Sequence, residues 1–444
     1  MTTAPQPSSH PATPPSPPPG CPAHASAGGS ELTFQADAVP LMGPRFQNDN
    51  RAQLYRDMHA QHGPLAPVTL PGDVPGWLVL GYRELHQITS NPALFSRDSG
   101  LWNQWGRIPA DWPLMPMVGK QPSILYTVGE RHQRRSALVS DALAAVDPFE
   151  LRDHAERFAD RLIDQLCGRG EADLVSEYAK VLPALVLARL YGFSDEDGAA
   201  LVPSINALVD GAEGALEGRD HVQSSMGRLL ASRQALPGAG VASRMLNHDY
   251  ADGFSFEEIL EDMMVNIVAG HQPTADWIGN SLRLMLTDDR FAASLSGGRH
   301  SVGEAMNEVL WEDTPTQNIA GRWATRDTQL GGRRVAAGDL LILSFAAANG
   351  DPQVRPDRSA FTGGNNAFLS FGHGDHRCPY PAQDIAEGIA RTGIEVLLDR
   401  LPDVDLAVGP QALVWRPSPW LRGLASLPVR FTPTPSTAAS GGTR

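Results

Sequence analysis

The sequence is poor in cysteine, in basic residues and in long apolar runs. Its 444 residues include three cysteines, Cys21, Cys167 and Cys378, which are too few for a disulfide framework. We therefore expect a reducing, cytoplasmic compartment. The net charge of −14 argues against nucleic acid or an anionic membrane as a partner. No run of about 18 apolar residues is present, so we expect no membrane span.

The two ends of the chain differ in composition from the rest. Residues 1–32 are rich in proline and serine, and they lack the apolar segment of a signal peptide. Residues 432–444 are similarly small and polar. Such segments bury too little apolar surface to offset the entropy of ordering, so we expect two disordered tails. Residues 33–431 are expected to form a single domain.

Helical periodicity dominates between about residues 130 and 290, and strand patterns are confined to short runs near 76–82 and 333–345. The longest helical pattern covers residues 255–286, about 45 Å at 1.5 Å per residue. Ser255 and the acidic residues after it are typical of a helix N-terminus. A helix so long and so apolar is expected to cross the middle of the molecule. A final helix is predicted over 384–401, and the fold class is mainly α with minor β.

The stretch "FGHGDHRCPYPAQ", residues 371–383, surrounds one of the three cysteines with glycine, histidine and proline. Cys378 precedes a predicted helix from about residue 382, where the helix dipole favours a thiolate and makes it a good metal ligand. Gly372 and Gly374 would let the backbone approach a flat, bulky partner closely. His376 has a donor for a carboxylate of that partner.

Two other interpretations of this cysteine compete. A lone cysteine in a cytosolic sequence is most often an inert core residue. His373, Asp375, His376 and Cys378 also have the atom types of a zinc site. Ligands packed so closely along the chain rarely wrap one tetrahedral ion, which makes zinc the weaker of the two.

The segment "FGHGDHRC" resembles the Phe-Gly-x-Gly-x-His-x-Cys segment of the cytochromes P450, the haem-thiolate monooxygenases. "LFSRD", "AGHQPT" and "GRWATRDTQLGGRRVAAGDLLILSF" follow in the family's order, and the resemblance covers about residues 35–430. It implies a single-domain cytochrome P450 fold, with haem b between the long central helix and the cysteine loop. Cys378 would then be the axial ligand of the haem iron.

The resemblance also implies which residues surround the haem. His376, Arg322 and His132 match the positions that bind the propionates, and Phe371 would pack beside the thiolate. Where the family has an arginine four residues after the histidine, this chain has Ser136, so Arg135 or Arg134 would have to supply that charge. The complete set of expected haem-binding residues is His132, Arg135, Ala269, Gly270, Arg322, Phe371, Gly372, His376 and Cys378.

The central helix departs from the family at its catalytic position. The acid and the threonine that normally assist proton delivery are replaced by Gln272 and Pro273. Proline cannot donate to the carbonyl of Ala269, so the helix is still expected to open there. Thr274 and His271 are candidate substitutes for the lost pair. The expected catalytic residues are therefore Thr274, Gln272 and His271.

A second departure concerns a buried acid. The family's Glu-x-x-Arg pair becomes Glu308 and Trp311, and the later arginine of that group aligns with Gly363. Both cationic partners of Glu308 are thus expected to be missing. Because an unpaired buried carboxylate costs several kcal/mol, Glu308 must be protonated, exposed or paired with another residue.

A third departure follows the cysteine, where Pro379 and Pro381 have no N–H groups to donate to the sulfur. Such hydrogen bonds tune iron–thiolate centres. We hypothesise a more electron-rich thiolate and a lower iron reduction potential. A redox titration that found a potential well above that of relatives with glycine here would contradict this hypothesis.

Two functions are consistent with these residues. The first is a monooxygenase that inserts one oxygen atom into a small hydrophobic substrate, with electrons from NAD(P)H passed on by ferredoxin reductase and ferredoxin. Its pocket would be lined by residues 265–275 and by 98–118, where Trp102, Trp105 and Trp112 either contact a ligand or merely pack the core. The second is a haem-binding protein with peroxide-dependent or no oxygenase activity, such as a regulatory component.

Overall fold

The computed structural model describes residues 37–47, 50–210, 214–288, 291, 301–355 and 365–436. The predicted tail at residues 1–32 lies outside the described residues, as does the second tail from residue 437 on. Thr432 donates its backbone N–H to the carboxylate of Asp403, and Thr434 donates its own to the carbonyl of Cys167. The chain therefore remains hydrogen-bonded past the boundary predicted at residue 432.

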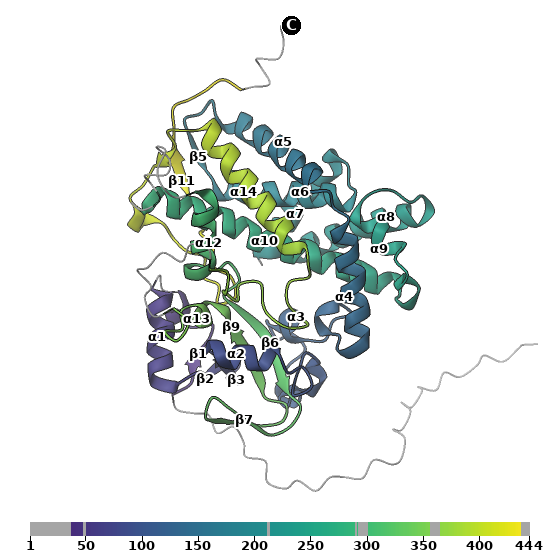
Figure 1. Ribbon diagram of the computed structural model, residues 1–444, viewed down its shortest axis with the longest axis vertical. Helices are drawn as coiled ribbons and strands as arrows, with labels where there is room; N and C mark the ends of the chain where they lie inside the picture. The colour runs from purple at the N-terminus through teal and green to yellow at the C-terminus, as the bar shows by residue number, and fades with distance from the viewer. Residues whose placement is uncertain are drawn as a thin grey trace, which may run out of the picture. The chain divides into compact units, whose positions relative to one another are not determined.

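Helices make up most of the described chain, as the periodicity predicted, and they gather on one side of a smaller sheet (Figure 1). The helices nearest the sheet are α1 Arg51–His62, α2 Tyr82–Thr89, α3 Met115–Val118 and α13 Phe345–Asn349. The larger helical group comprises α4 Gly129–Ala144, α5 Pro148–Leu166, α6 Leu182–Tyr191, α7 Asp195–Asp210, α8 Ala215–Ala235, α9 Val241–Leu246, α10 Phe256–Thr287, α12 Val302–Glu312 and α14 Ala382–Arg400.

The predicted central helix is α10, which is 32 residues long and contacts α6, α8, α12 and α14. Its first turn is closed by a capping box, in which Ser255 and Glu258 satisfy each other's backbone N–H groups. Pro273 lies inside the helix, and α10 continues as one helix on both sides of it. Apolar side chains from α10 and its neighbours form the larger hydrophobic core. Among the described helices, none combines the length and apolar character that crossing a bilayer requires.

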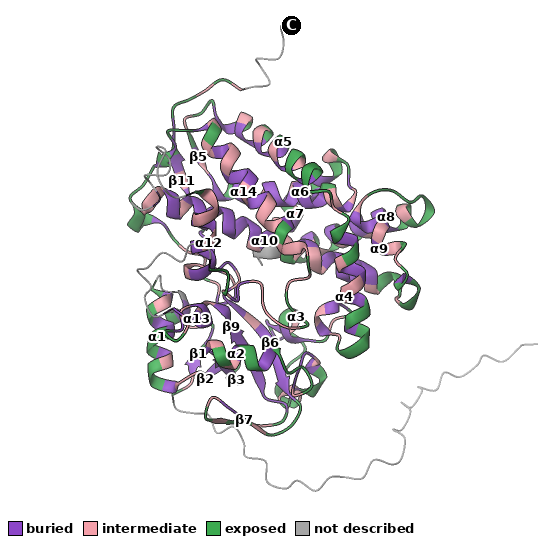
Figure 2. Ribbon diagram, in the orientation of Figure 1, coloured by how far each residue is buried: buried purple, intermediate pink, exposed green. Residues whose placement is uncertain are grey.

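The main sheet has six strands in the order β1-β2-β3-β9-β6-β4. These are β1 Val39–Pro40, β2 Leu65–Leu70, β3 Val74–Val79, β4 Phe95–Ser96, β6 Asn318–Ala324 and β9 Leu340–Ser344. Two smaller sheets contain β5 Glu171–Asp173, β10 Asp405–Leu406 and β11 Pro428–Arg430, and β7 Thr328–Leu330 with β8 Arg333–Val335. The strands of the main sheet are almost entirely buried, whereas outer helices such as α5 and α8 keep an exposed face (Figure 2).

The tryptophan-rich segment at 98–118 belongs to the smaller core beside this sheet. Trp102 and Trp112 are buried there, and Trp105 packs against the same cluster. The indole N–H of Trp112 donates to the carbonyl of Pro71, and the indole of Trp105 to that of Ser99. These indoles could have contacted a ligand or packed the core, and in the described residues they pack the core.

Candidate functional site

A cavity of about 290 Å³ lies between α10, α14 and the loop that carries Cys378. Its walls are mostly apolar. The predicted residues that line it are His132, Ala269, Gly270, Thr274, Phe371, Gly372, His376 and Cys378. Sequence reasoning expected residues 98–118 along its wall, but that position is taken by Ile124 and Leu125, a few residues further along the chain.

The loop before the cysteine depends on two glycines with positive φ. Gly372 has a φ of 74° and Gly374 a φ of 75°, values that favour glycine over other residues. A Cβ atom on Gly374 would clash with the carbonyl oxygen of Thr89 in α2. Of these two glycines, Gly372 lines the cavity and Gly374 does not. Gly372 therefore lies where a flat ligand could approach the backbone, whereas Gly374 lets the loop pack against α2.

Cys378 is half-buried and borders the cavity just before α14 begins at Ala382. Its backbone N–H donates to the carbonyl of Phe371 at 2.8 Å. Burial raises the pKa of the Cys378 thiol to about 11. A bound cation would reverse this preference, because a metal ion deprotonates a coordinating thiol. No group of three or more potential metal ligands occurs among the described residues, so the zinc interpretation gains no support.

Two stacked imidazoles form one polar edge of the cavity. The rings of His132 and His376 lie 3.8 Å apart between centroids, with an interplanar angle of 20°. One ring nitrogen of His132 pairs with the carbonyl of Asp375, and Nε2 of His376 donates to the carbonyl of Thr127 at 2.9 Å. Burial, with the nearby charge of Arg322, lowers the pKa of His376 to about 2. His376 is therefore a neutral hydrogen-bonding group unless an anion joins it.

Two buried arginines stand behind this edge. Arg322 on β6 is 5 % exposed, and burial lowers the pKa of its guanidinium. Its only hydrogen bond among the described residues is a long one, 3.4 Å from Nη1 to the carbonyl of Gly321. Arg97 donates to the backbone carbonyls of Leu125, Ala320 and Gly321. Within the described chain, neither arginine forms an ion pair, and the one carboxylate whose charge acts on Arg322 is that of Asp375.

Arg135 lies in a different environment from the one the resemblance implied. It does not line the cavity, and its guanidinium binds the carboxylate of Asp262 in a two-point ion pair. Ser136, the next residue, does line the cavity. Successive residues of a helix point about 100° apart, so the one-residue shift turns the arginine away from the cavity and toward α10. We therefore leave Arg135 out of the candidate haem-binding set.

The three expected catalytic residues of α10 separate in the structure. Thr274 lines the cavity, and its hydroxyl donates to the carbonyl of Gly270 at 2.6 Å. Gln272 and His271 are buried but do not line the cavity. The Gln272 amide donates to Asp276, and Nε2 of His271 donates to the carbonyl of Lys180 at 2.7 Å. Thr274 is therefore the one of the three that can touch a ligand directly.

The buried acid Glu308 is paired with another residue, which is one of the three outcomes expected for it without the family's two arginines. Arg355 binds Glu308 at 2.9 Å and Glu312 at 2.6 Å. Trp311, at the position of the family's arginine, donates its indole N–H to the carbonyl of Asn365 at 3.0 Å. Gly363 lies outside the described residues. The sequence carried no signal for Arg355, because its partner lies 47 positions away along the chain.

Comparisons with known proteins agree with the geometry. No family model matches the chain. A vitamin D(3) 25-hydroxylase of Pseudonocardia autotrophica is 30 % identical over 410 residues, covering 88 % of this chain and 96 % of the relative. Cytochrome P450 107B1 of Saccharopolyspora erythraea is 29 % identical over 375 residues, covering 83 % and 92 %. Among solved structures, CYP154C4 from a Streptomyces species has a TM-score of 0.78 at 28 % identity, covering 88 % of this chain and 97 % of that one.

The residues around the cavity fit haem. Its apolar walls suit a flat macrocycle, and the half-buried Cys378 could provide a sulfur ligand for its iron. His132, His376, Arg322 and Arg97 gather cationic and hydrogen-bonding groups with no carboxylate bound to the arginines among the described residues. A ligand that carries its own carboxylates would satisfy them, and haem has two.

Proposed function

Since this chain belongs to the cytochrome P450 family of haem-thiolate monooxygenases, we propose that it inserts one oxygen atom of O2 into a small apolar substrate. The electrons would come from NAD(P)H through a ferredoxin reductase and a ferredoxin, in the cytoplasm. The observation that carries the proposal is the cavity itself, which joins Cys378, Thr274 and the His132–His376 edge in one apolar chamber.

The roles of the residues follow from their positions. Cys378 would ligate the iron, and haem would then supply the dioxygen chemistry that thiolate ligation favours. The propionates would be held by the His132–His376 edge and by Arg322, with Arg97 behind it. Gly270 and Ala269 line the cavity from α10, and Phe371 and Gly372 line it from the cysteine loop.

Proton supply is proposed to rest on Thr274. Its hydroxyl lines the cavity, and it is already oriented by donating to the carbonyl of Gly270. Gln272 is bound to Asp276 instead, which limits it to support of the helix. This arrangement leaves one hydroxyl where the family has an acid and a hydroxyl.

The first experiment asks whether Cys378 ligates the iron. Purified protein is reduced and exposed to carbon monoxide, and the Soret band is compared with that of Cys378→Ser. We expect the shifted band of a thiolate-ligated haem in the natural protein and its loss in the variant. An identical spectrum from both proteins would contradict the assignment of Cys378.

The second experiment tests the reaction. NADPH oxidation through a surrogate ferredoxin and its reductase is measured with vitamin D3 as a probe, because one relative is a vitamin D(3) 25-hydroxylase. We expect a Soret shift on binding and an oxygenated product. Product that forms only with peroxide would support the alternative, a peroxide-dependent haem protein. That alternative is favoured by the loss of the family's acid–threonine pair, since Gln272 and Pro273 stand at its positions.

A further inference from the structure

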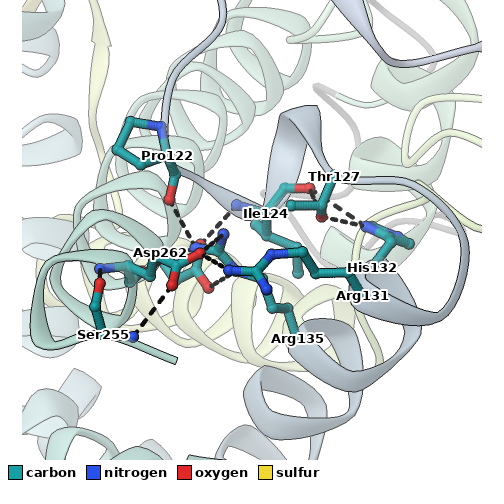
Figure 3. A network of polar contacts seen from close by, with 9 residues as sticks. Pro122, Ile124, Thr127, Arg131, His132, Arg135, Ser255 and Asp262 are labelled. Carbon is teal, nitrogen blue, oxygen red and sulfur yellow. Dashed lines mark hydrogen bonds and ion pairs between the residues drawn. The ribbon is translucent and has the colours of Figure 1, made fainter. Parts of the chain in front are cut away.

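A second polar cluster lies just outside the cavity wall, where α4, α10 and the segment between α3 and α4 meet (Figure 3). Nε of Arg135 lies 2.8 Å from one carboxylate oxygen of Asp262, and Nη2 lies 2.6 Å from the other. The side chains are 1 % and 3 % exposed. The pair therefore joins α4 to α10 in the protein interior with the two-point geometry that suits arginine and carboxylate.

The same two side chains also hold the chain segment at residues 119–128. Nη2 of Arg135 donates to the carbonyl of Pro122 at 2.9 Å, and Asp262 accepts the backbone N–H of Ile124 at 2.6 Å. Arg135 further donates to the carbonyl of Glu258 at 2.9 Å. Two backbone groups of one segment are thus fixed by a single ion pair.

That segment forms part of the cavity wall. Ile124 and Leu125 line the cavity, whereas Arg135 and Asp262 do not. The carbonyl of Ile124 also accepts the hydroxyl of Thr127 and lies 3.3 Å from Nδ1 of His132. A shift of the segment would therefore move the wall and the His132 edge together.

We propose that Arg135 and Asp262 are positioning residues that fix the 119–128 segment on α10 and thereby set the width of the cavity that a substrate enters. This inference rests on the proposed function, which assigns the cavity to haem and substrate. The resemblance expected an arginine at position 136, next to the haem. In this chain the arginine is Arg135, one position earlier, and it holds the 119–128 segment of the cavity wall.

The test compares ligands of different size that bind the same iron. Imidazole and 4-phenylimidazole each carry a nitrogen that ligates haem iron, and only the second is bulky. Their dissociation constants are measured from the Soret shift for the natural protein, for Asp262→Asn and for Arg135→Lys, which keeps the charge but loses the fork. Arg134→Gln is the matched control, since Arg134 pairs with Glu130 on the exposed face of the same helix.

We expect both variants to favour the bulky ligand over imidazole by at least fivefold more than the natural protein does, with no change in Arg134→Gln. Amide hydrogen exchange at Ile124 should accelerate at least tenfold in Asp262→Asn. Unchanged ligand preference and unchanged exchange, beside a lower unfolding free energy, would reduce the pair to a purely structural role and overturn the proposal. If even the natural protein failed to bind imidazole, the proposed function would fail, and the exchange measurement would still decide whether the pair holds the segment.

Discussion

Arg322 and Arg135 are both buried arginines near the cavity, and they differ in what meets their charge. Arg135 is bound by Asp262, by Glu258 and by two backbone carbonyls. Arg322 makes one long hydrogen bond and no ion pair within the described chain. Among the described residues, the protein thus supplies a paired carboxylate for Arg135 and none for Arg322.

The difference gives a physical criterion for separating support from ligand binding. A buried cation without a counter-charge is expensive, so a fold retains it where a bound anion supplies the missing charge. By that criterion we assign Arg322 to the proposed haem site and Arg135 to the scaffold. The sequence alone ranked both as haem-binding residues.

The largest expected effect comes from breaking the ion pair between Arg135 and Asp262. Arg135→Met leaves the Asp262 carboxylate buried without its cation, and we expect the unfolding free energy at pH 7.5 to fall by about 3–5 kcal/mol. Urea denaturation of the protein measures this. The double variant Arg135→Met/Asp262→Leu should recover most of the loss, because it removes both charges. A loss below about 1 kcal/mol in the single variant would argue that the pair is not desolvated.

The pH dependence of stability tests how burial affects the carboxylates of α10 that pair with arginines. Burial raises the pKa of Asp262 to about 6 despite the adjacent Arg135, and it raises the pKa of Asp276 to about 6 as well, beside Arg416. A carboxyl with a raised folded pKa binds more protons in the folded state, so stability should fall as pH rises from about 4 to about 6 and level off above that.

Each group contributes at most about 3 kcal/mol, from a shift of about two pKa units. Urea midpoints measured between pH 4 and pH 7 give the slope. Asp262→Asn should remove about half of it, with Asp276 accounting for the rest. A slope of the opposite sign in the natural protein would show that these carboxylates are stabilised in their charged form.

Substitution of Arg322 should have the opposite effect on the stability of the protein. Arg322→Met removes an unpaired cation, so the stability of the haem-free protein should not decrease. The bound haem loses a charged hydrogen-bond partner worth about 1.5–3 kcal/mol, and transfer of haem to apomyoglobin should accelerate about 10- to 100-fold. The exposed Arg326→Met is the control. Unchanged haem transfer would place the propionates elsewhere.

The smallest expected effect separates Thr274 from Gln272. Thr274→Ala should lower the yield of product per NADPH about two- to fivefold, the value of one hydrogen bond, because the hydroxyl lines the cavity. Gln272→Ala should leave the yield unchanged, since its amide is bound to Asp276. Equal effects in the two variants would remove the distinction drawn from their positions.

Much of the fold and most of the cavity lining were predictable from local sequence. The cysteine loop, with Phe371, His376 and Cys378, is a contiguous motif, and α10 has an apolar pattern with a capping box at Ser255. These features depend on residues a few positions apart. The comparisons confirm the family that the motifs indicated.

The remainder depended on contacts between distant segments. Arg135 and Asp262 are 127 positions apart, and Arg97 reaches carbonyls 223 and 224 positions away. Nothing in "RHQRRS" distinguishes an arginine that faces haem from one that faces α10, because only the packed helices define those faces. Arg355 escaped notice for the same reason.

Two of the buried carboxylates on helix α10, Asp262 and Asp276, lie 14 residues or about 21 Å apart along its axis. Arg135 fastens the first, and Arg416 from the C-terminal segment fastens the second at 2.6 Å. Most of the residues with which α10 lines the cavity, from Val265 to Thr274, lie between these two ion pairs, and Trp277 lies just beyond the second. Because α10 is held by an ion pair at both positions, we expect its distance from Cys378 to change little between ligands of different size.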